Sequence, residues 1–358
     1  MKNWNETKTI MDRLITVFQH RREAVLVTIV DIEGSSYRKR GAKLLVEADG
    51  GLTGNVSGGC LEADVRERAK QVLASGRAEI VTYNTSDDED SVWGLGMGCN
   101  GVITLLLQPM TPGKHRAFVL EASRALSGDA RLYWTVVLPP SDAAGGLRLV
   151  RDGEVLASTL DALAAEKLFL GGPIEPSGIH REGDFRVFSE TLSPPPFLVV
   201  CGAGDDAGPL CRLAQEVGFR VVVVDHRSAY AVSSRFSDGV KVVQQRPEEC
   251  GADLPSDKNT YVVIMTHSTS QDALWLKKFA NSKAAYIGLL GPGERRRKLV
   301  QQLELAMDQR IVGPVGLDLG ADGSEQIAVS IVAQLLIHRQ SEAGPAQPVP
   351  ETGGGQSS

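Results

Sequence analysis

The chain has 358 residues, which at about 150 residues per domain predicts two domains. Apolar residues make up 42% of the sequence and charged residues 23%, which excludes collagen, a coiled coil and wholesale disorder. Lys and Arg number 38 against 44 Asp and Glu, so the formal net charge is −6. This acidic balance argues against nucleic acid or an anionic membrane as the main partner, since both attract a basic face.

No stretch of about 18 or more apolar residues is present, so the sequence predicts no transmembrane helix. The polar segment 1–12 lacks the basic and apolar regions of a signal peptide. The five cysteines follow no framework spacing, which is typical of reduced thiols. We therefore expect a cytoplasmic protein that binds neither a membrane nor nucleic acid.

Amphipathic helices and strands alternate through the first half of the chain. Apolar residues recur at helical spacing over residues 5–22, which predicts a helix there. The Asp49-Gly50-Gly51 turn predicts a hairpin between the strands on either side of it. Further helices are predicted at 60–75, with Gly76 as the C-terminal cap, and at 114–126, and strands at 24–32, 42–47, from 52, and at 79–83, 102–108 and 131–138. The pattern over 139–190 is weak, and we expect a mixed α+β domain over residues 1–192.

The run Ser193-Pro194-Pro195-Pro196 marks a domain boundary. Three consecutive prolines favour a stiff, extended linker over residues 193–196. After it, uninterrupted apolar strands alternate with helices, which is typical of a parallel sheet covered on both faces. Strands are expected at 197–201, 220–225, 240–243, 260–266 and 284–290, and helices at 205–217 and 271–280. We therefore expect an α/β protein whose second domain, residues 197–340, is a Rossmann-like, doubly wound parallel sheet, followed by a disordered tail over 341–358.

The run from Gly202 to Ala207 has the form G-x-G-x-x-A and lies between a predicted strand and a predicted helix. Asp225 ends the next strand, 21 residues after Gly204. In that setting the glycines let the backbone approach a phosphate, and the acidic residue binds ribose hydroxyls. Asp205 and Asp206, however, place carboxylates where the phosphate would sit, unless they cap the helix. Two interpretations stay open: a dinucleotide site for NAD(P), or a Rossmann-type fold whose site is altered or empty.

Further polar residues follow the strands of this domain. Arg227 either contacts a ligand phosphate or is a solvated loop cation. His267 follows a strand end, where open α/β sheets bind ligands, and either donates to an anion or bonds a loop carbonyl. Asp318 lies in a glycine turn and is either a ligand or a helix cap. The charge run 295–298 is expected to be a solvated helix face.

Gly58, Gly59 and Cys60 stand directly before a predicted helix. A helix N-terminus stabilises a thiolate, so Cys60 is the best candidate for a reactive sulfur. Gly98 and Cys99 occupy a second glycine-rich loop. The alternative is that both cysteines are small residues packed in tight turns. The remaining cysteines are expected to be structural, and no cysteine pair has the spacing of a zinc site, so no metal site is expected.

The loop between residues 34 and 42 adds the hydroxyls of Ser35 and Tyr37 and the cation of Arg38 ahead of the hairpin. Clustered arginines favour phosphate or carboxylate, so this loop is a candidate anion clamp. The alternative is a basic turn that faces water.

These loops and the Rossmann segment together resemble the XdhC/CoxI family, whose members are accessory factors for molybdenum hydroxylases such as xanthine dehydrogenase and carbon monoxide dehydrogenase. The likeness rests on the order and spacing of several short motifs. In the first domain they lie at 34–38, 41–42, 56–62 and 94–99, and in the second at 224–227, 235–236, 265–267 with Asp272, 286–291, 316–320 and 327–331.

The resemblance implies a maturation role. Such a protein would bind molybdenum cofactor (molybdopterin), protect it while a terminal sulfido ligand is installed, and deliver it to an apo molybdenum hydroxylase. A cysteine desulfurase would supply the sulfur. The chemically active residues would be Cys60 and Cys99, and the cofactor contacts would be Ser35, Tyr37, Arg38, Gly58, Gly59, Glu62, Gly98, Gly202, Gly204, Asp225, Arg227, His267 and Asp318. We expect both cysteines to face a cleft between the domains, and by analogy a homodimer.

The leading hypothesis is thus a cofactor-insertion chaperone without conventional turnover. Two other classes stay open. One is an oxidoreductase that uses NAD(P) at the glycine turn that begins at Gly202. The other is a sulfur-relay protein in which Cys60 carries a persulfide.

Overall fold

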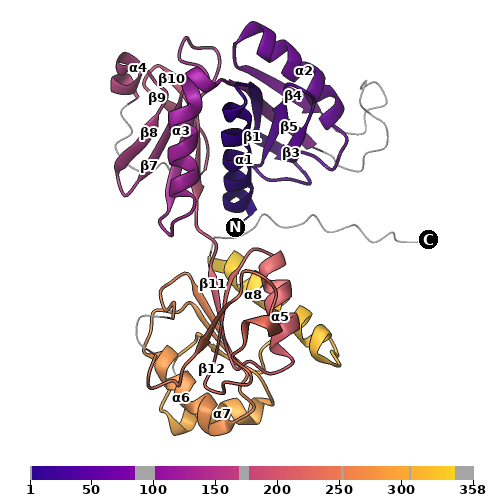
Figure 1. The fold of residues 1–358 in the computed structure, drawn as a ribbon, viewed down its shortest axis with the longest axis vertical. Coiled ribbons are helices and arrows are strands. Elements are labelled where there is room, and N and C mark those ends of the chain that lie inside the picture. The colour runs from indigo at the N-terminus through magenta and orange to yellow at the C-terminus, as the bar shows by residue number, and fades with distance from the viewer. Residues whose placement is uncertain (1, 85–100, 169–176, 251–253, 306–307, 343–358) are drawn as a thin grey trace, which may run out of the picture. The chain divides into compact units, whose positions relative to one another are not determined.

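The computed structural model describes residues 2–84, 101–168, 177–250, 254–305 and 308–342. The chain divides into two compact units, Met1–Pro194 and Pro195–Ser358 (Figure 1). Each unit has its own sheets and its own hydrophobic core, so the two are described separately.

The first unit contains two five-stranded antiparallel sheets. Sheet A has the order β3-β2-β1-β5-β4, formed by β1 (Ala24–Gly34), β2 (Lys43–Glu47), β3 (Leu52–Gly54), β4 (Glu79–Asn84) and β5 (Gly101–Met110). The predicted hairpin is present, since β2 and β3 pair antiparallel and the side chain of Asp49 accepts the N–H of Gly51 at 3.0 Å.

Sheet B has the order β8-β7-β6-β10-β9, formed by β6 (Leu132–Val137), β7 (Leu147–Arg151), β8 (Glu154–Ser158), β9 (Gly178–Glu182) and β10 (Phe185–Leu192). Most of this sheet comes from residues 139–190, where the sequence pattern is weak. Its edge strand β8 shows why: no residue of β8 is buried, so the strand lacks a strong apolar signal.

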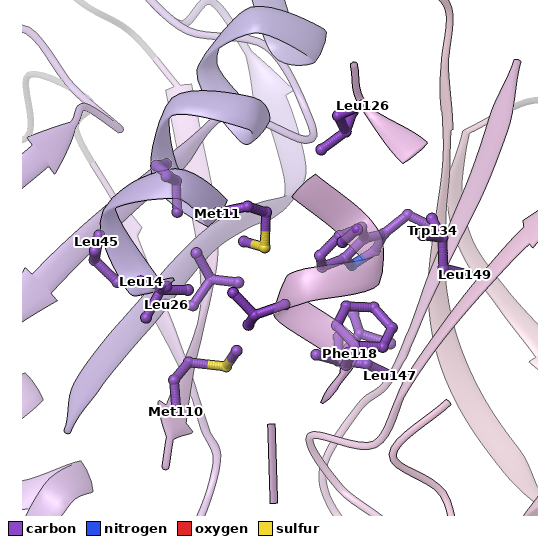
Figure 2. Close-up of a cluster of buried hydrophobic side chains, with 14 of the residues drawn as sticks. Met11, Leu14, Leu26, Leu45, Met110, Phe118, Leu126, Trp134, Leu147 and Leu149 are labelled. Atoms are coloured by element: carbon purple, nitrogen blue, oxygen red, sulfur yellow. The ribbon is translucent and has the colours of Figure 1, made fainter. Parts of the chain in front are cut away.

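The core of the first unit continues from one sheet to the other (Figure 2). Helices α1 (Lys2–Gln19) and α3 (Pro112–Ala125) contribute Leu14 and Phe118, and the Phe118 ring meets the edge of Trp134 in sheet B at 5.0 Å between centroids. Helix α2 (Glu62–Ser75) covers the other face of sheet A, where Val25 and Val27 of β1 are buried. Because β1 has a helix on each face, its sequence is a continuous apolar run.

Gly76 ends α2 as predicted. Its φ of 66° is left-handed, and its N–H bonds the carbonyl of Val72. A short helix α4 (Ala162–Lys167) completes the first unit, with the side chain of Asp161 accepting the N–H of Ala164 at its start.

The second unit is a six-stranded parallel sheet in the order β13-β12-β11-β14-β15-β16. Its strands are β11 (Phe197–Cys201), β12 (Arg220–Asp225), β13 (Lys241–Gln244), β14 (Thr260–Ile264), β15 (Tyr286–Leu289) and β16 (Ile311–Val312). In chain order this is 3-2-1-4-5-6, the strand order of a dinucleotide-binding Rossmann domain. The predicted Rossmann-like, doubly wound fold is therefore confirmed.

Helices lie on both faces of this sheet. Residues of α6 (Thr269–Ala280) and α7 (Gly293–Gln302) share a core with one face. Helix α5 (Ala207–Glu216) packs against α8 (Ser324–Glu342), and the two lie together on the other side (Figure 1). Among the residues that the structure describes, no helix is long and apolar enough to cross a membrane.

Candidate functional site

The antiparallel pairing of sheet A brings the predicted first-unit loops to one end of the sheet. Strand β1 ends there at Gly34, which pairs with Gly101 at the start of β5. Strand β3 ends there too, and β2 begins there, because β2 runs antiparallel to both β1 and β3. We call this the loop end of sheet A. It carries the Tyr37 loop, residues 35–42, and the Cys60 loop, residues 55–61.

The second cysteine loop joins strands at the same end. Strand β4 ends at Asn84, which pairs with Val102 of β5. Gly98 and Cys99 lie between these strands but outside the described residues, so their predicted role stays a prediction.

The Tyr37 loop carries an exposed aromatic side chain and, at the next residue, a buried cation. The side chain of Tyr37 is 68% exposed, and Ser35 is exposed as well. The guanidinium of Arg38 is buried, where it forms an ion pair with Glu6 of α1 and donates to Asn55 of the Cys60 loop. Arg38 therefore holds protein groups in this structure, and the exposed cation beside it in the loop is Lys39.

The Cys60 loop is closed by Ser57 and Glu62. The hydroxyl of Ser57 donates to the Glu62 carboxylate and accepts the N–H groups of Gly59 and Leu61 at 3.1 and 3.2 Å. Glu62 in turn accepts the N–H of Ser57 at 3.1 Å, a reciprocal pattern like a capping box. Glu62 thus shapes the loop that precedes α2.

Cys60 projects from this loop as an exposed, free thiol. Gly59 has a φ of +112°, which side-chain-bearing residues rarely adopt. A Cβ placed on Gly58 or Gly59 would meet no atom within 4 Å, so the space next to these two glycines, which directly precede Cys60, is open. This is the environment in which a larger ligand can approach a sulfur.

The other described cysteines differ from Cys60. Cys201, Cys211 and Cys250 are buried. Burial raises the pKa of the Cys201 thiol and raises that of Cys211 to about 12, so neither supplies a thiolate near neutral pH. Within the described ranges, no group of three or more His, Cys, Asp or Glu side chains could hold a metal ion.

The glycine turn of the second unit lies at the carboxyl end of β11. Gly202 has a φ of +117°, and a Cβ there would come within 2.5 Å of the Met265 carbonyl oxygen. Only glycine fits at this position. Strands β11 and β14 are neighbours in the sheet. The chain continues from β11 to β12 on one side of this pair and from β14 to β15 on the other side, so the strand order reverses between them. The turn therefore occupies the point where Rossmann folds place their ligand.

Asp225 is fully engaged with the protein. One carboxylate oxygen accepts the N–H of Ala203 and the Arg227 guanidinium, at 2.8 and 2.7 Å, and the other accepts the Arg227 backbone and Nε, at 2.9 and 3.0 Å. Burial opposes ionisation, but the hydrogen bonds from Arg227 and Ala203 outweigh it and hold the pKa of Asp225 below its usual value. Arg227 also stacks on Tyr230, 3.9 Å from its ring centroid.

The two carboxylates just before α5 contact an arginine and a histidine. Asp205 forms an ion pair with Arg235 at 2.6 Å. Asp206 stands at the N-cap position, but its side chain makes no capping bond and instead lies 3.1 Å from Nε2 of His267. His267 is 61% exposed in its side chain and has a left-handed φ of 58°.

These contacts test the site against NAD(P). A ribose would have to displace bonds that Asp225 already makes, and a pyrophosphate at the start of α5 would meet the carboxylates of Asp205 and Asp206. The arrangement in this structure therefore does not fit a dinucleotide.

The charge run of α7 is not a uniformly solvated face, contrary to the expectation from the sequence. Arg295 forms an ion pair with the buried carboxylate of Asp272, which also accepts the hydroxyl of Thr266. Arg296 donates to the carbonyl of Ile311. The expectation was wrong for these two arginines because spacing alone did not show that the first turn of α7 lies beside α6 and β16.

Asp318 is exposed and lies more than a hundred residues after the glycine turn at Gly202. Its loop is held by α8, where Ser330 donates to the carbonyl of Leu317 and Gln334 bonds both backbone groups of Gly316. These α8 contacts account for the loop's shape, and Asp318 as a ligand stays a prediction.

The fold and these sites define a two-unit α/β protein with a Rossmann-type second unit and an exposed thiol on a glycine loop of the first. The chain matches the family described as the XdhC Rossmann domain over residues 198–335, and the XdhC and CoxI family over residues 18–84. The second range contains both the Tyr37 loop and the Cys60 loop.

Similar proteins match along nearly the whole chain. A Bacillus subtilis protein described as a probable xanthine dehydrogenase subunit is 31% identical, over 94% of this chain and 98% of its own. The molybdenum cofactor insertion chaperone PaoD of Escherichia coli is 23% identical, over 95% and 92% respectively. A solved structure from Bacillus halodurans, described as a xanthine dehydrogenase, is similar with a TM-score of 0.79 and 31% identity, and covers 94% of this chain and 98% of that one. The chain belongs to the XdhC and CoxI family, as its motifs predict.

Proposed function

We propose that this protein binds molybdenum cofactor as cargo and assists its insertion into a molybdenum hydroxylase of the xanthine dehydrogenase type. Family membership supports the proposal, together with two relatives matched over most of their length: one described as a probable xanthine dehydrogenase subunit, the other as a molybdenum cofactor insertion chaperone. Fold alone would not support it, because Rossmann domains serve many functions.

The observation that carries the proposal is the exposed thiol of Cys60, which follows two glycines that border open space at the loop end of sheet A. The cargo joins a soft molybdenum–dithiolene group to a planar pterin and an anionic phosphate. A cysteine sulfur suits the soft centre, an exposed aromatic suits the planar ring, and a cation suits the phosphate. Cys60, Tyr37 and Lys39 provide these three groups at one end of one sheet.

Replacing Cys60 by Ala tests the proposal. We expect purified Cys60→Ala protein to bind the cofactor about tenfold more weakly, equivalent to about 1.4 kcal/mol. Molybdenum bound per protein after gel filtration, across a series of cofactor concentrations, measures the change.

A matched variant moves the thiol without removing it. In Cys60→Ala/Ala63→Cys the sulfur stands one helical turn further on, at an exposed position of α2. We expect this double variant to bind as weakly as Cys60→Ala. If Cys60→Ala retains as much cofactor as the wild type, the thiol takes no part in binding and the proposal fails.

The delivery step involves two partners in this proposal. A cysteine desulfurase supplies the sulfur for the terminal sulfido ligand, and an apo-hydroxylase in the cytoplasm receives the finished cofactor. Activation of the apo-hydroxylase by loaded protein, with and without the desulfurase, tests both.

In the sulfur-relay alternative Cys60 itself gains a sulfur atom, which mass spectrometry after incubation with desulfurase and cysteine would detect. That Cys60 and Cys99 face the Rossmann unit stays a prediction.

A further inference from the structure

The buried guanidinium of Arg38 joins two elements that both carry proposed ligand groups. Its side chain is only 5% exposed, although it lies one residue from the exposed Tyr37. One terminal nitrogen contacts the Glu6 carboxylate and the other contacts the side-chain oxygen of Asn55. Because a guanidinium is a rigid, planar fork, these contacts fix the Cys60 loop relative to the Tyr37 loop.

Glu6 anchors the same junction to α1. Its second carboxylate oxygen accepts the N–H of Lys43, the first residue of β2, at 3.1 Å. A Cβ on Gly54, the last residue of β3, would approach that oxygen to 3.4 Å. Glu6 therefore sits between the end of the Tyr37 loop and the start of the Cys60 loop.

Sheet B supplies a third anchor. The ammonium of Lys43 is fully buried, pairs with Glu190 of β10, and donates to the carbonyl of Gly41 at 3.0 Å. It also lies 5.5 Å from the ring centroid of Trp134. Because desolvation offsets its attraction, a buried pair of this kind adds little net stability while both partners are present, but removing one partner leaves an uncompensated buried charge.

We propose that Arg38 is a positioning residue, which holds Tyr37 and Cys60 at a fixed spacing so that one ligand meets both. This inference rests on the proposed function for the identity of that ligand. The positioning itself is a property of the ligand-free chain. It also assigns Arg38 a different role from the anion clamp that the sequence suggests.

The test breaks the link at Asn55, which keeps the Arg38–Glu6 ion pair intact. In Asn55→Ala we expect amide hydrogen exchange of residues 55–61 to speed up about tenfold in the ligand-free protein, because a hydrogen bond to a charged group is lost. We also expect the alkylation rate of Cys60 by iodoacetamide, read from the Cys60 peptide by mass spectrometry, to rise with it. Asn55→Asp restores a partner for the guanidinium and should restore both rates.

Arg40→Gln is the matched control. Arg40 lies in the same loop but pairs with Asp31 of β1 and bonds the carbonyl of Ile32. We expect this variant to leave hydrogen exchange of residues 55–61 and Cys60 alkylation unchanged. A global unfolding curve for each variant shows that the loop rates are compared among folded proteins.

The outcomes separate this inference from the proposed function. If Asn55→Ala lowers cofactor binding while loop exchange and Cys60 alkylation stay at wild-type rates, the positioning role is overturned and the cofactor proposal stands. If the loops loosen in Asn55→Ala but Cys60→Ala binds cofactor as well as the wild type, the positioning role stands and the cofactor proposal fails.

Discussion

Two charged residues show how far the chemistry of a side chain can be inferred from its type. Arg38 and Asp225 both fit ligand-binding motifs in the sequence, and in the structure both bind protein groups. Residue type indicated correctly that each takes part in charged hydrogen bonds. Which partner each takes depends on Glu6, which is 32 residues from Arg38, and on the backbone N–H of Ala203, in the glycine turn that the motif assigns to a ligand phosphate.

A histidine outside the proposed sites gives a prediction at the same scale. His115 of α3 is buried, and its Nδ1 accepts the N–H of Thr111 at 3.0 Å. Burial, with a smaller effect of Lys114, lowers the pKa of His115 to about 4 from 6.5. The folded state thus favours neutral His115. The contribution of neutral His115 to stability is fully present above about pH 6.5 and is lost as the pH falls towards 4.

We expect His115 to lower the free energy of unfolding by about 3 kcal/mol as the pH falls from about 6.5 to 4 and below. Urea unfolding of the wild type and His115→Gln at several pH values measures the difference. The variant should lose less stability over this range, since it has no ring to protonate. Equal pH dependence in both proteins would contradict the prediction.

Elements with a strong periodic signal were predicted correctly. The hairpin of β2 and β3, the end of α2 at Gly76 and the five main strands of the Rossmann unit follow from local patterns of apolar residues and turns. Of sheet B, only β6 was predicted, because strands such as β8 are short and partly exposed. The loop end of sheet A was predicted in part. Its loops were identified from their glycines and cysteines, but only the strand pairing shows that they lie at the same end of one sheet.

The glycines of the Cys60 loop allow a prediction at this scale. Gly58→Ala adds a methyl group in open space, so we expect the free energy of unfolding to change by less than about 0.5 kcal/mol while cofactor binding weakens. Gly59→Ala forces a side chain into a left-handed conformation and should cost about 1 kcal/mol or more. Denaturant unfolding and cofactor titration of each variant separate the two effects.

Gly113→Ala in α3 is the control, since a Cβ there also meets no atom within 4 Å. It should leave cofactor binding unchanged. Were Gly58→Ala to bind cofactor like this control, the space beside Cys60 would have no part in binding.

For the whole molecule, the chain length and the proline run predicted two domains, and the structure divides into two units after Pro194. The Rossmann fold was predicted, whereas the sequence left two interpretations open for its ligand site: a dinucleotide site, or one that is altered or empty. The glycine turn, the helix and Asp225 have the expected spacing, yet the carboxylates of Asp205 and Asp206 and the bonds of Asp225 oppose a dinucleotide.

We therefore predict that the full-length protein shows no saturable NADPH binding in the micromolar range, measured by nicotinamide fluorescence. The double variant Asp205→Ser/Asp206→Ser, which removes two negative charges, should bind NADPH more tightly than the wild type. Saturable micromolar binding by the wild type would revive the oxidoreductase hypothesis.

The core shared by the two sheets of the first unit bears on how a cargo could enter and leave. Helices α1 and α3 contribute side chains to one apolar cluster with both sheets, so neither sheet can open without exposing the other's interior (Figure 2). We therefore expect the first unit to unfold as one body rather than sheet by sheet. If the protein carries cofactor as proposed above, loading and release fall to the loops at the loop end of sheet A, while the two sheets stay packed together.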